Sequence, residues 1–236
     1  DASLEVVDRS RDEIAALGDV WVQPLVTRGV TALADWVDQE GPTVIVALRR
    51  FDFSFGPLYD EGGVNLEISL LNRHFTGGVD PRVKANNRLG AVRSELKSRR
   101  QAARTGEFTM GVVFSDDGSV SESHGANLGI VVGDTFVRPP RDEALEGISL
   151  ETVCDLARQL GMTVEARRFT TYDILNADET FIMSTSYGVL PVKSLDGIPL
   201  RAGRRTYSQI LRAWVDLVGF DFVSQAREQA ERLAGA

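Results

Sequence analysis

The stretch Gly118-Ser-Val-Ser-Glu-Ser-His-Gly-Ala-Asn-Leu128 sets one carboxylate, Glu122, among small and polar residues, in the middle of a run of short apolar segments. The turn sequences Asp116-Asp-Gly118 and Gly133-Asp134 separate these segments and are typical of β-hairpins. The pattern therefore predicts strands over residues 108–114, 119–121, 127–132 and 135–137.

The chain on both sides of these hairpins mixes helical and strand patterns. A continuous apolar run over 43–48 and a period-two alternation over 64–70 are typical of strands. The sequence also predicts strands over 20–26, 163–168 and 179–184, and helices over 11–17, 84–104, 149–161, 205–218 and 222–234. We therefore expect a mixed α/β (α+β) fold.

A segment dense in glycine, proline and aspartate, residues 54–63, interrupts this order of elements. We place a domain boundary within it. The predicted parts are a small N-terminal domain over 1–57, a linker over 58–61 and a larger domain over 62–236.

The predicted helix over 84–104 has an amphipathic pattern. Its apolar residues Leu89, Val92, Leu96 and Ala103 recur at spacings of three, four and seven, which places them on one stripe. The basic residues between them lie largely off this stripe. We interpret the basic side chains as the solvated face of the helix.

The overall composition excludes several classes of protein. The chain has 236 residues and a formal net charge of −8, which disfavours binding to nucleic acid and to anionic membrane surfaces. One cysteine and two histidines are too few for an internal disulfide or a structural zinc site, so we expect no metal. The apolar runs are far shorter than the ~20 residues of a membrane span. We expect a cytoplasmic protein.

Four motifs follow one another in a particular order. They are Val83-Lys-Ala-Asn-Asn-Arg-Leu89, the Glu122 stretch, Gly147-Ile-Ser149, and Ala177-Asp-Glu-Thr-Phe-Ile-Met-Ser-Thr-Ser186. In this order and spacing, the chain from about Val20 to Leu211 resembles the class IV (fold type IV) enzymes that use pyridoxal 5′-phosphate. This family includes branched-chain and D-amino acid aminotransferases and aminodeoxychorismate lyase.

The resemblance implies a fold and two central side chains. The implied fold has a small α/β domain followed by a larger domain with a β-barrel-like sheet flanked by helices. Lys84 matches the lysine that forms a Schiff base with the cofactor aldehyde and then moves a proton. Glu122 matches the acidic residue that faces the pyridine nitrogen and keeps it protonated.

The resemblance also implies how the rest of the cofactor is held. A helix that begins at Gly147-Ile-Ser149 offers backbone N–H groups to an anion, which the helix dipole favours. The loop after Glu122 approaches the cofactor closely. The implied cofactor-binding residues, besides Lys84 and Glu122, are Gly125, Asn127, Ile148, Ser149, Ser184 and Thr185.

The implied activity is that of an aminotransferase, which moves an amino group between an amino acid or amine and a 2-keto acid. The sequence Asn87-Arg88-Leu89 looks more like that of aminodeoxychorismate lyase, which forms 4-aminobenzoate. This lyase is the first alternative. A catalytically inactive relative with the same fold is the second. Arg88 and Arg28 are the candidates for contact with substrate, although Arg28 could instead cap its turn.

The resemblance also implies a phosphate-binding arginine that does not match any motif of this sequence. The family's small domain carries an arginine that pairs with the cofactor phosphate, and we expect this residue upstream of residue 1. The small domain accordingly looks shortened at its front. Family members are at least dimeric, so the resemblance implies a homodimer whose partners are small-molecule amino donors and keto acids.

Overall fold

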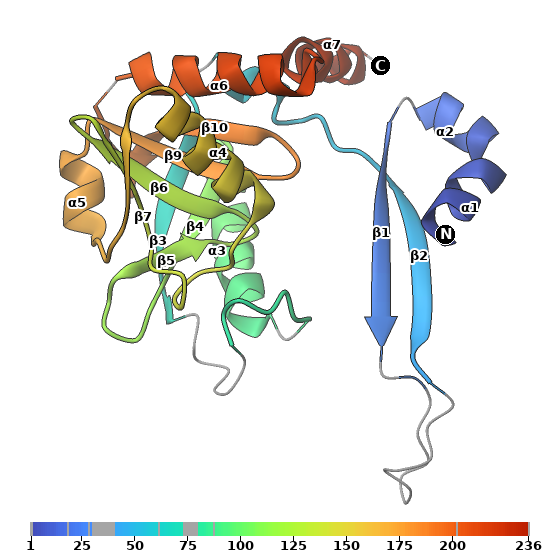
Figure 1. Cartoon of the computed structure of the whole chain (residues 1–236), viewed down its shortest axis with the longest axis horizontal. Coiled ribbons are helices and arrows are strands. Elements are labelled where there is room, and N and C mark those ends of the chain that lie inside the picture. The colour runs from blue at the N-terminus through green and yellow to red at the C-terminus, as the bar shows by residue number, and fades with distance from the viewer. Residues whose placement is uncertain are drawn as a thin grey trace, which may run out of the picture. The chain divides into compact units, whose positions relative to one another are not determined.

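The computed structural model describes residues 2–17, 19–27, 29, 41–60, 62–72, 80–86, 88–201 and 203–235 (Figure 1). The chain divides into two compact units, Asp1–Phe53 (the small unit) and Ser54–Ala236 (the large unit). The division lies before the short 3-10 helix η1 (Gly56–Tyr59), whereas the sequence places the end of the small domain at residue 57. Tyr59 explains this difference, because its hydroxyl donates a 2.8 Å hydrogen bond to the Tyr187 carbonyl of the large unit.

The small unit contains two helices and a β-hairpin among its described residues. These elements are α1 (Ala2–Arg9), α2 (Arg11–Leu17), β1 (Val20–Thr27) and β2 (Thr43–Arg50). The two strands pair antiparallel, with Pro24 of β1 opposite Val46 of β2. Each strand of a two-stranded sheet has a free edge, where a proline disturbs the hydrogen-bond ladder little. The position of Pro24 agrees with the general preference of proline for edge strands.

The large unit is built on a mixed nine-stranded sheet in the part of the chain that the structure describes. Its strands are β3 (Val64–Asn72), β4 (Thr109–Phe114), β5 (Val120–Ser123), β6 (Asn127–Val132), β7 (Thr135–Arg138), β8 (Thr163–Ala166), β9 (Glu179–Ser184), β10 (Gly188–Leu195) and β11 (Ile198–Pro199). Their order is β5-β4-β3-β10-β9-β6-β7-β8, and β11 pairs with β10. A β-bridge between Ser123 and Ala126 joins the end of β5 to the start of β6, so the sheet curls back on itself. This confirms the predicted barrel-like sheet.

Helices cover the outside of this sheet (Figure 1). The first to follow β3 is α3 (Leu89–Thr105), which packs on β3 and β4. Helices α4 (Ile148–Gln159) and α6 (Arg205–Val218) pack on other strands of the sheet, β9 and β10. The short α5 (Thr171–Asn176) precedes β9, and the C-terminal α7 (Phe222–Ala234) packs on η1. No helix in the described ranges is both long and apolar enough to cross a membrane.

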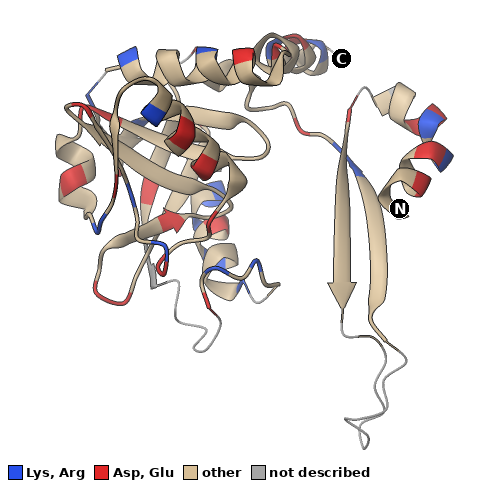
Figure 2. Cartoon of the chain, in the orientation of Figure 1, with Lys and Arg blue, Asp and Glu red and all other residues tan. Residues whose placement is uncertain are grey.

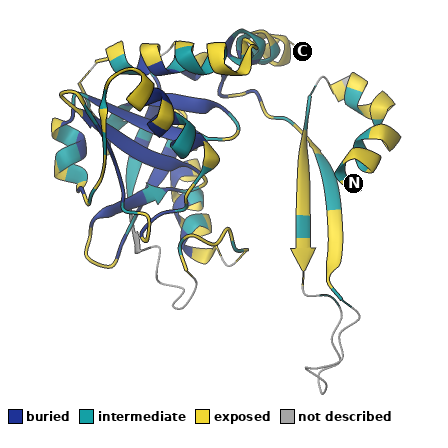
Figure 3. Cartoon of the chain, viewed as in Figure 1, coloured by how far each residue is buried: buried dark blue, intermediate teal, exposed yellow. Residues whose placement is uncertain are grey.

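The hydrophobic core lies along the central strands (Figure 3). Leu128 and Ile130 of β6 and Phe181 and Ile182 of β9 are completely buried. The first five residues of β6 are all buried instead of alternating. A strand covered on both faces has this pattern, because neither face meets water.

The structure corrects the sequence-based prediction for α3. The helix begins at Leu89, five residues after the predicted start at 84. The residues before it form turns, in which the N–H of Val83 donates to the Asp80 carbonyl at 2.9 Å and the N–H of Ala85 donates to the Val83 carbonyl at 2.8 Å. Lys84 therefore lies in a loop that precedes the helix.

The apolar stripe of α3 is also not buried. Leu89, Val92 and Leu96 are 54%, 44% and 52% exposed, while the buried residues of the helix are Gly90, Ser94 and Ser98. The reason is Gly111 of β4, where an added Cβ would lie 2.0 Å from the Ser94 Oγ. Small residues face each other here because the helix approaches the strand closely. The basic residues of α3, which are blue in Figure 2, are exposed, as predicted.

Candidate active site

A pocket in the large unit collects residues from four separate parts of the chain. Its walls are the loop 80–85 with the start of α3, the turn between β5 and β6, the start of α4, and the end of β9. Among the residues that line it are Lys84, Arg88, Glu122, Gly125, Asn127, Ile148, Ser149, Ser184 and Thr185. The structure thus brings together every sequence-predicted site residue that it describes. Arg28 lies outside the described residues.

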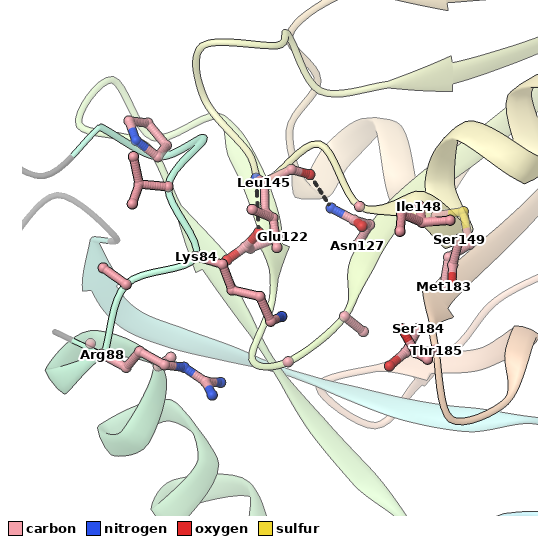
Figure 4. A pocket seen from close by; sticks show the side chains of 18 of the residues that line it. Lys84, Arg88, Glu122, Asn127, Leu145, Ile148, Ser149, Met183, Ser184 and Thr185 are labelled. Atoms are coloured by element: carbon pink, nitrogen blue, oxygen red, sulfur yellow. Dashed lines mark hydrogen bonds between the residues drawn. The ribbon is translucent and has the colours of Figure 1, made fainter. Parts of the chain in front are cut away.

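Lys84 projects from its loop into the pocket (Figure 4). An ion pair between Arg82 and Asp80, at 2.6 Å, braces this loop, and the Arg82 guanidinium lowers the pKa of the Asp80 carboxyl to about 2. The Lys84 amine has no hydrogen bond or ion pair to another described residue. Its nitrogen is therefore available to a molecule in the pocket.

The lysine content of the chain makes Lys84 distinctive. The sequence contains three lysines, and the other two are Lys97 and Lys193. Lys97 lies 3.3 Å from the Glu67 carboxylate, and Lys193 lies 3.0 Å from that of Glu107. Neither residue lines the pocket. Lys84 is thus the lysine that can supply an amine there.

Glu122 is half-buried and lies on β5, opposite Val113 of β4. The backbone N–H of Leu145 donates a 3.3 Å hydrogen bond to Glu122 Oε2. The Leu145 carbonyl accepts a 2.7 Å hydrogen bond from Asn127 Nδ2. The Leu145 backbone therefore connects the carboxylate with the amide at the start of β6 (Figure 4).

The loop that carries Leu145 is itself anchored by Glu143. The Glu143 carboxylate is buried and accepts hydrogen bonds from the hydroxyls of Ser115 at 3.2 Å and Ser119 at 3.1 Å. The Glu143 carbonyl accepts a 2.5 Å hydrogen bond from the hydroxyl of Ser121, the residue before Glu122. These bonds fix the position of Leu145 relative to β5.

The N-terminus of α4 opens into the pocket. Gly147 is its N-cap residue and makes no side-chain cap hydrogen bond. The first N–H groups of an α-helix have no partner within the helix, so those of Ile148 and Ser149 can bind an anion. The Ser149 side chain is buried at the pocket wall. An added Cβ on Gly147 would lie 2.1 Å from Asn127 Oδ1, so the close approach of these two segments requires glycine.

Ser184 and Thr185 border the same space at the end of β9 (Figure 4). The turn that follows them is held in place by the hydrogen bond from Tyr59 to the Tyr187 carbonyl. Gly125, between β5 and β6, has a φ of +80°, a left-handed conformation that favours glycine. The hydroxyl groups and the α4 N-terminus together form a polar, uncharged end of the pocket.

Several lining residues were not expected from the sequence. Asp80, Pro81, Leu145 and Met183 line the pocket as well. Leu145 had no detectable signal, because it acts through its backbone N–H and carbonyl, which do not depend on the type of side chain. Asp80 had a weak signal, since it directly precedes a proline that ends a glycine-rich segment. No group of three or more His, Cys, Asp and Glu side chains suited to a metal ion occurs among the residues described.

Comparison with known proteins identifies the family. The model of the family "Amino-transferase class IV" matches residues 4–195. The branched-chain-amino-acid aminotransferase of Pseudomonas aeruginosa is 26% identical over 204 residues, which are 86% of this chain and 65% of that protein. The chain therefore spans less than two thirds of the length of this curated relative.

Solved structures agree with this match. The branched-chain amino acid aminotransferase of Escherichia coli has a TM-score of 0.74 and 26% identity, covering 90% of this chain and 71% of that chain. The fold is shared with a branched-chain amino acid aminotransferase from T.th. complexed with N-(5′-phosphopyridoxyl)-L-glutamate, at a TM-score of 0.71, 23% identity, 92% of this chain and 71% of that chain. This chain belongs to the class IV aminotransferase family.

Proposed function

We propose that the protein is an aminotransferase that uses pyridoxal 5′-phosphate and moves an amino group between an amino acid or amine and a 2-keto acid. The observation that carries this proposal is the composition of one pocket. It combines an unpaired lysine amine, Lys84, with a carboxylate, Glu122, and with a helix N-terminus beside hydroxyl groups.

The residues present fit the three chemical ends of this cofactor. The Lys84 amine suits the aldehyde, and the Glu122 carboxylate suits a protonated pyridine nitrogen. The phosphate suits the α4 N-terminus, where the N–H groups of Ile148 and Ser149 have no partner within the helix. The proposed phosphate-binding residues are Ile148, Ser149, Ser184 and Thr185, with Gly125 and Asn127 shaping the turn beside them.

When bound, the cofactor supplies an aldehyde that condenses with amines and a ring that accepts an electron pair from the substrate α-carbon. Lys84 Nζ would hold the cofactor through its aldehyde carbon until an amino donor replaces it. The same nitrogen would then be free to move a proton between the substrate α-carbon and that former aldehyde carbon. Glu122 would keep a proton on the ring nitrogen, and the Leu145 N–H holds this carboxylate in place.

Arg88 is the proposed contact for the substrate. Its guanidinium reaches into the pocket from the N-cap of α3, on a different wall from Ser149 (Figure 4). A guanidinium binds a carboxylate with directed hydrogen bonds, so this position suits the carboxylate that amino acids and 2-keto acids share. The family resemblance extends the proposal to a cytoplasmic homodimer with one such pocket in each subunit, and leaves Arg28 as a second candidate for substrate contact.

The decisive experiment is Lys84→Ala. The purified wild-type protein, mixed with pyridoxal phosphate, is expected to absorb visible light and to transfer amino groups from a panel of donors to 2-oxoglutarate. Lys84→Ala should lose both properties, because neither remaining lysine lines the pocket. Lys193→Ala is the matched control and should keep both.

Three results would contradict the proposal. Turnover by Lys84→Ala would show that the lysine is wrongly assigned. Formation of 4-aminobenzoate from aminodeoxychorismate, without amino transfer from any donor, would indicate the lyase. A wild-type protein that stays colourless with the cofactor would indicate a catalytically inactive relative.

A further inference from the structure

A buried arginine lies behind the N-terminus of α4. Arg138, the last residue of β7, is only 3% exposed. Its guanidinium forms an ion pair with Glu151 in the first turn of α4, and its Nε donates a 3.2 Å hydrogen bond to the Pro139 carbonyl. Its Nη2 has no hydrogen bond in the described part of the chain and lies 3.8 Å from Glu146 Oε1. Burial of a guanidinium is costly, so its partners must hold it firmly.

A second arginine completes the group. Arg141 Nε lies 3.1 Å from Glu146 Oε1, and Arg141 Nη2 lies 3.9 Å from Glu151 Oε2. We call Arg138, Arg141, Glu146 and Glu151 the arginine–glutamate cluster. Its two positive and two negative charges cancel, and its two carboxylates come from either side of the segment Gly147–Leu150.

This segment contains the proposed phosphate-binding groups, Ile148 and Ser149. A carboxylate in the first turn of a helix favours the helix itself. It also opposes any anion that binds at the same N-terminus, because like charges repel over several ångströms. Glu151 and Glu146 would therefore weaken a phosphate site unless their charges were neutralised. Arg138 contacts Glu151 directly and lies within ion-pair distance of Glu146.

We propose that Arg138 is a positioning residue for the phosphate end of the cofactor. It ties the start of α4 to β7, and it neutralises the carboxylates beside the helix N-terminus without lining the pocket itself. The protein thereby prefers the phosphorylated cofactor over its unphosphorylated form, pyridoxal. This inference rests on the proposed function, because it assumes that the phosphate binds at α4.

A purely structural role for Arg138 makes a different prediction. If the arginine only stabilised the fold, its loss would weaken binding of pyridoxal phosphate and pyridoxal to the same degree, since both would need the same folded pocket. The ratio of the two affinities therefore separates the two roles. The ratio does not depend on turnover, so binding measurements with the two ligands are enough to determine it.

The test measures the dissociation constants of pyridoxal phosphate and pyridoxal from the visible absorbance that each produces with the protein. Arg138→Met should weaken pyridoxal phosphate on the order of tenfold, through the charge of Glu151 at the helix N-terminus, and leave pyridoxal nearly unchanged. Arg138→Met/Glu151→Gln should recover most of the lost preference, because it removes the excess negative charge that the loss of Arg138 leaves in the cluster. Arg227→Met is the control: it removes the 2.6 Å ion pair to Asp60, away from the pocket, and should leave the ratio at the wild-type value.

An unchanged ratio of the two dissociation constants in Arg138→Met, whether both affinities stay the same or both fall equally, would overturn the inference. If Arg138→Met does not fold, Glu151→Gln alone decides: it leaves excess positive charge at α4 and should raise the preference for pyridoxal phosphate, and an unaltered or lowered preference would count against the role. Failure of the proposed function looks different, because the wild-type protein would then produce no absorbance with either ligand.

Discussion

Helices α3 and α4 carry similar apolar patterns and use them in opposite ways. In α4, Leu150, Val153 and Leu156 are essentially fully buried against the sheet and α6. In α3, Leu89 and Leu96 are each more than half exposed, and serines occupy the buried face. An apolar stripe thus predicts that a helix is amphipathic, but it does not predict which face meets the sheet.

For α3, the strand beneath the helix decides which face is buried. Gly111 of β4 allows α3 to come so close that Ser94 and Ser98 fit where leucine would not. Ser98 satisfies its hydroxyl locally, by donating a 2.9 Å hydrogen bond to the Ser94 carbonyl. This close packing holds the start of α3, where Arg88 enters the pocket directly after the Lys84 loop.

The largest expected effect comes from truncating a leucine of α4. Leu156→Ala should lower the free energy of unfolding by about 2–5 kcal/mol, because it opens a cavity at a residue that is 1% exposed. Leu96→Ala in α3 is the matched control and should change stability by less than about 0.5 kcal/mol, because the side chain is 52% exposed. Urea unfolding of both variants measures the difference. Equal losses would mean that the stripe of α3 is buried in solution.

The second prediction tests the close approach of α3 to β4. Gly111→Ala should destabilise the protein by about 1–3 kcal/mol, because its Cβ would meet the Ser94 Oγ at 2.0 Å. Ser94→Ala alone should cost little or stabilise, since its buried hydroxyl has no hydrogen-bond partner in the described structure. The double variant should be less destabilised than the sum of the two, as thermal unfolding can show. Strict additivity would argue against the contact.

A smaller effect is expected from His124, which lies at the same contact. Its Nδ1 accepts a 2.9 Å hydrogen bond from the Gly111 N–H, and burial lowers its pKa below the ordinary 6.5, although Glu95 opposes the shift. Because the unfolded chain binds this proton more readily, the stability contributed by His124 is complete above pH 6.5 and is lost as the pH falls through the folded pKa.

His124→Gln should therefore flatten the loss of stability between about pH 7 and pH 5, since glutamine can accept the same hydrogen bond without titrating. Urea midpoints across this range provide the measurement. His74 is present in both proteins, so the difference reports on His124 alone. A parallel pH dependence in the two proteins would show that His124 titrates equally in the folded and unfolded states.

Much of the candidate site could be predicted from the sequence because its residues lie in short motifs. The order of the motifs indicated Lys84, Glu122 and Ser149, and the structure places all three around one pocket. The hydrogen bond between Leu145 and Glu122 could not be predicted, because it joins a backbone N–H to a side chain 23 residues away. The burial of Arg138 was equally hidden, since an arginine in a sequence is normally expected at the surface.

The sequence by itself determined the local elements. The β6 strand at 127–132 and the two C-terminal helices follow from patterns that extend over only a few residues, such as turn chemistry and apolar periodicity. The tertiary structure alone decided which face of α3 is buried, where Lys84 lies relative to that helix, and which groups meet at the start of α4. These features depend on distant segments coming within a few ångströms of each other, and no local pattern encodes that distance.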